Sequence, residues 1–502
     1  MPNIDLSLQI TLDGPLRWAE VAAVARGARL QLAPSAERRI LAARRLVDAI
    51  VEQGIRAYGV STGVGALCDV VVDRADQGRL SRNLLMSHAA GVGQLLGPAE
   101  TRAIMAAAIN NFAHGYSGLR AQAVRHVEAF LNRDCLPEVP AGGSVGYLTH
   151  MAHIALVTIG EGNARVRGAR MSGAEALREI GLEPLTLEAK EGLSLVNGTP
   201  CATGLAAVAL DRVERLLAWA DVVGAMTFET LRGQLSAFAA ESLALRRSAS
   251  LVAVGARLRE LLAGSALLEA SRGNRTQDPL SLRAIPHVHG AACDVFTATA
   301  EVVDRELTAV TDNPIVTGTP ERPVVYSEAH AVPAALALAL DSLGTAVASV
   351  AAMSERRVDR LVNPLVSRLP AFLTSVAGVG SGLMIAQYTA ASLVAENRRL
   401  AAPASLDGGI TSGLQEDHLC HSTPAALKLL RIIDNAEHVL AIELLAATQG
   451  YDLLTDQLPR APRTDVFQRA VRRLVPHYRD DRPIADDFVT IRAGLLVLPP
   501  EP

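Results

Sequence analysis

The sequence predicts a mostly α-helical protein, built as a bundle of long helices with a loop-rich N-terminal part. Hydrophobic residues make up 49% of the 502 residues, whereas aromatic residues make up only 3%. A core of Ala, Leu and Val favours closely packed helices over a β-sandwich, whose strands favour aromatic and β-branched residues. Apolar residues also recur at helical spacing in residues 203–226 and 425–449, where they lie mainly on one face.

Three parts are expected along the chain. Residues 1–195 are expected to form a loop-rich helical domain that carries Tyr58 and His88, and residues 196–455 a central bundle of long helices. Residues 456–502 are richer in Asp, Arg and Pro, which is typical of a peripheral cap. Polar residues gather between the periodic segments. This arrangement indicates a helical scaffold that carries its chemistry on loops.

The composition argues against several classes of protein. A formal net charge of −4, from 48 basic and 52 acidic residues, argues against a nucleic-acid-binding protein. The apolar stretch Ala331–Met353 is interrupted by Asp341 and other polar residues, so a buried helix is expected there rather than a membrane span. Five cysteines without paired spacing, together with an N-terminus unlike a signal peptide, indicate a cytoplasmic protein.

Histidines cluster in three places, but none of the clusters predicts a metal site. His150 and His153 lie three residues apart, His287 and His289 lie two apart, and the run Glu416–His421 holds five potential ligands. Zinc sites need three or four ligands, and none of these runs reproduces the pattern of a metal-dependent hydrolase. We therefore expect no metal, with these histidines hydrogen-bonded at helix ends or in a polar pocket.

Two glycine-rich segments and one arginine are candidates for binding a substrate. The glycines of residues 58–65 form either a plain turn or a loop that brings the backbone close to a ligand, with the Tyr58 hydroxyl in a pocket. A second glycine-rich turn, residues 142–146, precedes an expected helix whose N-terminus favours negative charge. Arg283 is either a surface residue or a fork that binds a carboxylate with two hydrogen bonds.

Six short motifs, in order along residues 15–455, resemble the histidine ammonia-lyase family and its phenylalanine and tyrosine relatives. The runs are 58–65 (YGVSTGVG, family YGVNTGFG), 87–93 (SHAAGVG in both), 195–199 (LVNGT, family LLNGT), 277–283 (QDPLSLR, family QDPYSLR), 311–314 (TDNP, family SDNP) and 415–418 (QEDH, within family NQEDHV). A single motif of this kind would carry little weight, but six in the family's order identify the chain as a member.

The resemblance implies a homotetramer, with each active site built from loops of several subunits and with a small-molecule amino acid as substrate. It also implies an elimination in which a β-proton and the α-amino group leave the substrate. Among the matched positions, Tyr58 takes part in proton transfer, Asn197 is an active-site amide, and Arg283 binds the substrate carboxylate. The remaining matched positions are polar contacts of the substrate or supports of the site: His88, Gln277, Asn313, Gln415 and Glu416, of which Glu416 contacts the imidazole or amine end.

The sequence also departs from the family at the position of its prosthetic group. Family members carry Ala-Ser-Gly after GSVG, and these three residues cyclise to an electrophilic methylideneimidazolone. Here Gly146 is followed directly by Tyr147, which stands in the position of the family's aspartate. Smaller or apolar residues also replace family aromatics at Val64, Leu280 and Ala329. Either the group is masked in the sequence between Gly146 and Tyr147, or the electrophile is lost and Tyr147 lines a remodelled pocket.

The resemblance therefore predicts a carbon–nitrogen lyase that acts on histidine or a histidine-derived substrate and gives a urocanate-type acrylate. Without the electrophile, the leaving group is expected to be trimethylamine from a thiohistidine betaine, as in ergothionase-type relatives. The alternatives are an ordinary ammonia-lyase with a masked electrophile and an inactive scaffold of the same fold. If Tyr58 takes the β-proton, an arginine or a helix terminus has to favour its ionised form.

Overall fold

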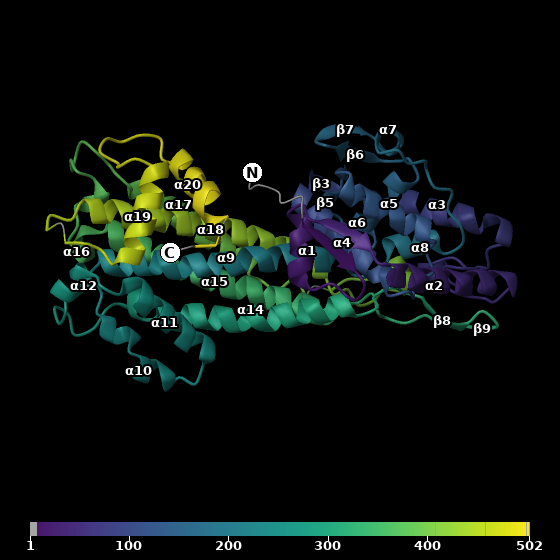
Figure 1. Ribbon diagram of the computed structural model, residues 1–502, viewed down its shortest axis with the longest axis horizontal. Helices are drawn as coiled ribbons and strands as arrows, with labels where there is room; N and C mark the ends of the chain where they lie inside the picture. The colour runs from purple at the N-terminus through teal and green to yellow at the C-terminus, as the bar shows by residue number, and fades with distance from the viewer. Residues whose placement is uncertain (1–7, 407, 457, 498, 501–502) are drawn as a thin grey trace. The chain divides into compact units, whose positions relative to one another are not determined.

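The computed structural model describes residues 8–406, 408–456, 458–497 and 499–500. Helices dominate the described chain, and this confirms the predicted mostly α-helical class (Figure 1). The chain divides into two compact units that alternate along the sequence. Unit 1 consists of Met1–Asp211, Thr299–Asp341 and Pro403–Leu427, and unit 2 of Arg212–Ala298, Ser342–Ala402 and Lys428–Pro502. The predicted domain limits near residues 195 and 455 stay predictions.

Unit 1 combines short and medium helices with small β-sheets (Figure 1). Its helices are α1 (Trp18–Ala25), α2 (Pro34–Glu52), α3 (Gln77–His88), α4 (Pro98–Ala113), α5 (Ala121–Asn132), α6 (Thr149–Thr158), α7 (Gly173–Glu179) and α8 (Glu191–Val196). Its strands pair as β1 (Gln9–Leu12) with β2 (Arg29–Leu32) in parallel, and in antiparallel fashion as β3 (Val92–Leu95) with β5 (Pro140–Gly142), β4 (Cys135–Pro137) with β6 (Asn163–Val166), β6 with β7 (Ala169–Ser172), and β8 (Ile315–Thr319) with β9 (Arg322–Tyr326).

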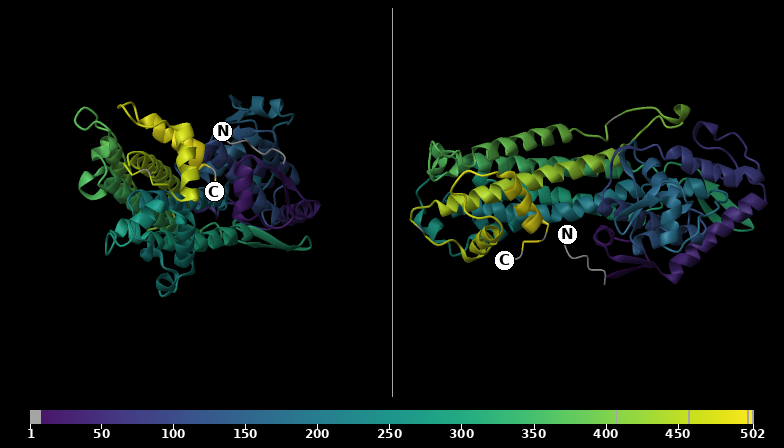
Figure 2. Two further views of the ribbon diagram at one scale, coloured as in Figure 1. Left: turned by 60° about the vertical axis from the view of Figure 1, so that its left-hand side comes forward. Right: turned by 90° about the horizontal axis from the view of Figure 1, so that it is seen from above.

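Unit 2 is a bundle of helices. Its shorter members are α10 (Ala240–Ala244), α11 (Ala249–Leu262), α12 (Ala266–Ala270), α13 (Leu280–Arg283), α16 (Pro364–Ser367), α17 (Met384–Leu400), α19 (Pro462–Leu474) and α20 (Ala485–Ile491). The long helices α9 (Pro200–Thr230), α14 (Ile285–Thr308), α15 (Ala334–Val362) and α18 (Ser422–Asp452) each contain a point where the chain passes from one unit to the other, and a fifth such point, between Ala402 and Pro403, follows α17. Within unit 2, α15, α17 and α18 run alongside one another (Figure 2).

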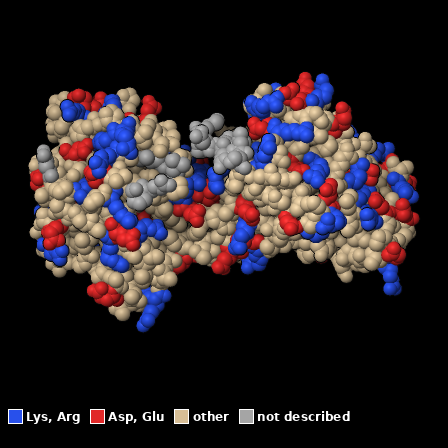
Figure 3. All heavy atoms as spheres, in the orientation of Figure 1, with Lys and Arg blue, Asp and Glu red and all other residues tan. Residues whose placement is uncertain are grey.

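The long helices are apolar because they pack against other helices. By length and composition alone, Glu191–Thr230 and Ala334–Val362 could cross a membrane. The apolar window of the first is completely buried, as expected for a core helix, whereas half of the second window is buried. On the face drawn in Figure 3, acidic and basic side chains are interspersed within each unit.

Candidate active site

Hydrophobic contacts in unit 1 anchor the loop that carries Tyr58. Its neighbours Ala57 and Val60 are buried in a cluster with Val47 and Ile50 of α2. The cluster therefore fixes the backbone on both sides of Tyr58 and leaves the tyrosine ring only half-buried. The start of the glycine-rich loop is therefore anchored in the core.

Gly65 closes this loop over the tyrosine. Its backbone N–H donates to the Tyr58 hydroxyl oxygen at 3.0 Å. Gly65 has φ +56°, and a Cβ atom placed there would lie 2.0 Å from Oγ of Ser412. A side chain at this position would both strain the backbone and collide with the loop around Ser412. The backbone conformation therefore favours glycine where the Tyr58 loop meets the loop that carries Glu416.

The second loop is held in a short antiparallel bridge between Thr411 and Glu416. The N–H of Thr411 donates to the carbonyl of Glu416 at 2.9 Å, and the Thr411 hydroxyl donates to the Glu416 carboxylate, also at 2.9 Å. Glu416 is half-buried, whereas the adjacent Gln415 is exposed. The bridge fixes the direction of the Glu416 side chain within unit 1.

A tight turn places Tyr147 beside Glu416. Ser144 accepts a hydrogen bond from the N–H of Gly146 at 3.1 Å and donates to the carbonyl of Tyr147 at 3.0 Å. The carbonyl of Gly146 accepts from the hydroxyl of Thr423 at 3.1 Å. The Tyr147 hydroxyl lies close enough to the Glu416 carboxylate for that carboxylate to raise its pKa. The structure thus brings Tyr58, Tyr147 and Glu416, which are distant in sequence, into one site.

The electrostatics of this site are set by burial and by Glu416. Burial raises the pKa of Tyr58, and Glu416 and Cys68 raise it further, although the N–H of Gly65 opposes them. Burial followed by Glu416 also raises the pKa of Tyr147. Burial lowers the pKa of His88 at the end of α3, against the opposing effect of Glu416. Both tyrosines therefore keep their protons at neutral pH, and His88 favours its neutral form.

The mechanism is expected to need a field that favours ionised Tyr58, whereas the described surroundings of Tyr58 in one chain raise its pKa. The physical reason is chiefly burial, which disfavours the charged phenolate, and the carboxylate of Glu416 adds to this effect. The requirement for such a field stays a prediction.

Asn197 and Asn313 lie next to the buried carboxylate of Asp312 and contact each other. Asn197 follows the last residue of α8 and is 6% exposed. Its Nδ2 donates to Oδ1 of Asp312 at 3.3 Å and to the carbonyl of Asn313. Oδ1 of Asn313 accepts from the N–H of Glu328 at 2.8 Å. The asparagine amides identified from the motifs are therefore held by the protein itself.

Gln277 and Arg283 belong to unit 2, where the structure places them together. With the Gln277 amide oxygen facing the guanidinium group, it accepts from Nε of Arg283 at 3.0 Å. Arg283 also donates to the carbonyl of Asp278. These bonds direct the half-buried guanidinium group and support the role of Gln277 as its polar neighbour. The other sequence-derived site residues all lie in unit 1.

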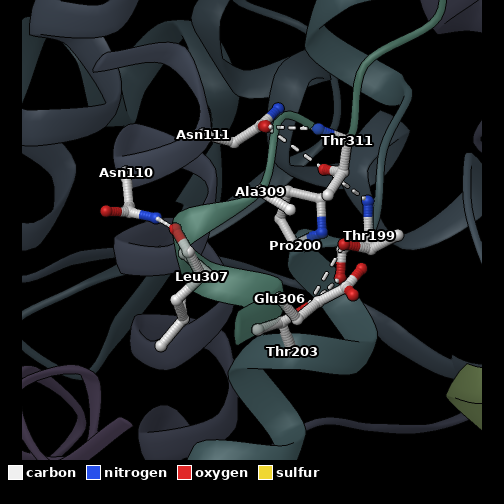
Figure 4. A pocket seen from close by; sticks show the side chains of 10 residues that line it. Asn110, Asn111, Thr199, Pro200, Thr203, Glu306, Leu307, Ala309 and Thr311 are labelled. Carbon is white, nitrogen blue, oxygen red and sulfur yellow. Dashed lines mark hydrogen bonds between the residues drawn. The ribbon is translucent and has the colours of Figure 1, made fainter. Parts of the chain in front are cut away.

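A small cavity lies beside Thr199 and Thr311 (Figure 4). It measures about 10 Å³, which is room for one water molecule. Thr199, Thr203 and Glu306 line its lower side (Figure 4). Burial raises the pKa of the Glu306 carboxyl group.

Sequence reasoning missed several polar residues around the site. Lys190 and Asp312 are fully buried beneath Asn197, and Cys420 lies beside the Gly146 turn, where a Cβ atom on Gly146 would be 3.4 Å from its sulfur. A lysine just before the apolar run of α8, and an aspartate inside the TDNP motif, were available signals. Among the described residues, no group of three or more His, Cys, Asp or Glu is arranged to hold a metal ion.

The chain belongs to the aromatic amino acid lyase family, whose family model matches residues 16–473. It is similar to a histidine ammonia-lyase of Anaeromyxobacter sp. (strain K), with 45% identity over 96% of this chain and 97% of that protein. It also resembles the crystal structure of histidine ammonia-lyase from Trypanosoma cruzi, with 36% identity, a TM-score of 0.89, and coverage of 97% of this chain and 93% of that one.

A further solved relative is the ergothioneine-degrading enzyme ergothionase from Treponema denticola, in complex with desmethyl-ergothioneine sulfonic acid. The identity is 28% and the TM-score 0.89, over 97% of this chain and 98% of that one. The family assigned from the six motifs and the ammonia-lyase fold are both confirmed.

The residues of the Gly146 turn do not fit the prosthetic group that the family resemblance implies. Gly146, Tyr147 and Leu148 include no serine whose hydroxyl could be eliminated. The nearest serine, Ser144, precedes a valine, and its hydroxyl is engaged on both sides within the turn. The chemistry below is therefore derived from this chain's own side chains.

Proposed function

We propose that the protein is a carbon–nitrogen lyase that acts on a histidine-type amino acid and gives a urocanate-type acrylate. The similarity to histidine ammonia-lyases over nearly the whole chain supports the reaction class. Retention of Tyr58, Asn197, Arg283 and Glu416 argues against an inactive scaffold. In the reaction a base removes the β-proton, the electrons of that C–H bond form the new C=C bond, and the C–N bond breaks with its electrons on the departing amine.

The observation that carries the choice of leaving group is the direct Gly146–Tyr147 peptide where the family has Ala-Ser-Gly. An electrophile activates a free amine by bonding to its lone pair. A quaternary ammonium group has no lone pair and leaves as a neutral amine, so it needs only a base, a clamp and charge stabilisation. Two tyrosine rings and the Glu416 carboxylate are suitable surroundings for a permanent cation. We therefore favour trimethylamine from a betaine of histidine or thiohistidine.

In this mechanism Arg283, held by Gln277, binds the substrate carboxylate with two parallel hydrogen bonds. Tyr58 takes the β-proton from the substrate, and Tyr147 donates a hydrogen bond within the pocket. Asn197, Asn313, His88 and Gln415 complete the polar contacts of the substrate. Because the surroundings of Tyr58 in one chain raise its pKa, a positive charge has to reach it from outside those surroundings.

A homotetramer with shared active sites would supply that charge through Arg283 of another copy. Exposed apolar side chains in unit 2 support assembly into an oligomer. Leu365 is 90% exposed, Val379 is 89% exposed, and Ile385 on α17 is also exposed. The half-buried apolar window of α15 adds to this surface. The five cysteines are free, which is typical of a reducing compartment, and we propose a soluble cytoplasmic enzyme.

The test compares purified protein on histidine, on its trimethylated betaine and on the thiolated betaine, following the acrylate by absorbance. Turnover of a betaine with histidine unchanged is the expected result. Rapid turnover of histidine alone favours an ordinary ammonia-lyase, the alternative that the 45% identity to such an enzyme supports. Intact mass against the coding sequence then decides whether an Ala-Ser-Gly, less two waters, is masked. No turnover of any of the three favours an inactive scaffold.

A further inference from the structure

The buried lysine at the start of α8 has an unusual position. Lys190 precedes the helix with φ +68°, and its side chain is fully buried. Its ammonium group donates to the carbonyl of Ser117 at 2.7 Å, to the hydroxyl of Ser194 at 2.8 Å and to Oδ2 of Asp312 at 3.3 Å. All three hydrogen atoms of the ammonium group thus have an acceptor.

The other carboxylate oxygen of Asp312, Oδ1, contacts residues of the site. This oxygen accepts from Nδ2 of Asn197 at 3.3 Å and from the N–H of Asn313 at 2.8 Å. The carboxylate is therefore shared between a cation on one side and two site residues on the other. Since Lys190 fixes Oδ2, it also fixes the plane in which Oδ1 can bind the amide of Asn197.

A second tie joins the same two loops. Oδ1 of Asn111 accepts from both the N–H and the hydroxyl of Thr311 at 3.2 Å, and the hydroxyl of Thr311 accepts from the N–H of Thr199, also at 3.2 Å (Figure 4). The segments 197–199 and 311–313 are therefore tied together just after Asn197. The orientation of the Asn197 amide is then set by its two acceptors, Oδ1 of Asp312 and the carbonyl of Asn313.

Burying a lysine and an aspartate together costs desolvation, and a well-packed apolar pair of similar volume is often at least as stable. Stability alone therefore gives little reason for a charged pair beneath Asn197. Burial lowers the pKa of Lys190, and the neighbouring Asp312 opposes this shift. The arrangement of the pair is instead suited to orienting its neighbours, because every acceptor and donor around it is defined.

We propose that Lys190 and Asp312 are positioning residues that hold the amide of Asn197 in the one orientation used in the elimination. The inference rests on the proposed function of Asn197 as a site residue. The pair acts through Asn197 and does not itself touch the substrate. Removing Lys190 should then lower kcat far more than it changes KM, because the amide is misplaced when charge develops on the substrate.

The test is a double-mutant cycle with Lys190→Met and Asn197→Ala. Lys190→Met alone is expected to lower kcat about 100-fold, with KM changed by less than about threefold. In the Asn197→Ala background the same change is expected to lower kcat by less than about twofold, because the group it positions is gone. A further loss near 100-fold in that background would overturn the inference. Asp312→Asn, which keeps the shape of the side chain, repeats the cycle if Lys190→Met does not fold.

The matched control is Arg460→Met, which breaks a buried ion pair with Glu229 in unit 2. It should lower the melting temperature in the same way as Lys190→Met and leave kcat unchanged. A control that lost kcat equally would mean that any buried pair has this effect, which contradicts positioning.

A crystal structure of the Lys190→Met protein separates this inference from the proposed function. A rotated Asn197 amide that no longer contacts Asp312 supports positioning even if no tested substrate is turned over. An unchanged contact overturns it.

Discussion

The two units use the same device, a fully buried ion pair, for different purposes. In unit 2, Arg357 of α15 binds Glu443 of α18 through two hydrogen bonds of 2.6 and 2.9 Å. Ser354 and Thr227 donate to the same carboxylate, each at 2.6 Å. Both oxygens of Glu443 therefore accept hydrogen bonds from side chains of the long helices. In unit 1, the carboxylate of the Lys190–Asp312 pair accepts from a site amide instead. The role of a buried pair is thus decided by what surrounds it.

The units also differ in where their polar chemistry lies. In unit 1, Tyr58, Tyr147 and Glu416 stand on loops that short bridges and one buried cluster hold in place. In unit 2, Arg283 ends the short helix α13 and is directed by Gln277. Removing side chains in unit 1 should therefore affect mainly catalysis, and removing buried charges in unit 2 mainly stability.

The largest expected effect is that of Tyr58→Phe, which should lower kcat about 1000-fold. The variant loses only the hydroxyl that handles the proton, so the melting temperature should change little. Tyr326→Phe, at an exposed tyrosine of the same unit, is the matched control. Tyr147→Phe is measured in parallel by acrylate absorbance. If it alone abolishes turnover, Tyr147 rather than Tyr58 handles the proton.

Arg357→Met should affect stability instead. It leaves the carboxylate of Glu443 buried without its cation, at a cost of about 3–5 kcal/mol in unfolding free energy. The control is Arg463→Met, which breaks an exposed pair with Glu260 and should cost less than about 1 kcal/mol. Denaturant unfolding measures both. Equal costs for the two variants would remove the distinction between scaffold and surface pairs.

Gly65→Ala tests how the two loops of unit 1 meet. The added Cβ atom collides with Ser412 at φ +56°, and we expect a loss of about 2 kcal/mol together with reduced kcat, since Gly65 donates to Tyr58. Gly54→Ala is a control for backbone strain alone, because Gly54 has φ +64° and no atom within 4 Å of the added Cβ. Adding Ser412→Ala should recover the part due to the collision. No recovery would show that the collision is irrelevant.

Arg283→Lys should lower kcat/KM about tenfold, or ~1.4 kcal/mol of transition-state stabilisation. An ammonium group cannot form the two parallel bonds that a guanidinium forms with a carboxylate. The exposed Arg272→Lys serves as control, and steady-state kinetics on the active substrate measures both. Unchanged kinetics for Arg283→Lys would exclude the clamp.

The smallest expected effect is a pH dependence of stability that differs between the units. Burial lowers the pKa of four histidines in unit 1, which are His88, His114, His150 and His153. Below about pH 6.5 these histidines bind protons in the unfolded chain but remain neutral in the folded chain. The free energy of unfolding therefore falls as the pH falls. In unit 2, burial lowers the pKa of His287 and His438.

Hydrogen exchange at pH 7.5 and 5.5 should therefore show a greater loss of protection in unit 1 than in unit 2. Equal loss in the two units, or greater protection at pH 5.5, would contradict the assignment.

The sequence by itself determined the helical class and the family. Both follow from information that is local in the chain: small apolar residues at helical spacing, and short motifs such as those around Tyr58 and Asn197. The missing tripeptide before Tyr147 could also be identified in this way, because it is a gap in a motif.

Only the tertiary structure decided which of these residues act together. Lys190 and Asp312 are separated by 122 residues, and no pattern in either segment shows that they pair beneath Asn197. The raised pKa of Tyr58 likewise depends on burial and on Glu416, which a distant loop supplies. Helix formation is governed by neighbours a few residues apart, whereas desolvation and charge pairing depend on segments that meet only in the folded chain.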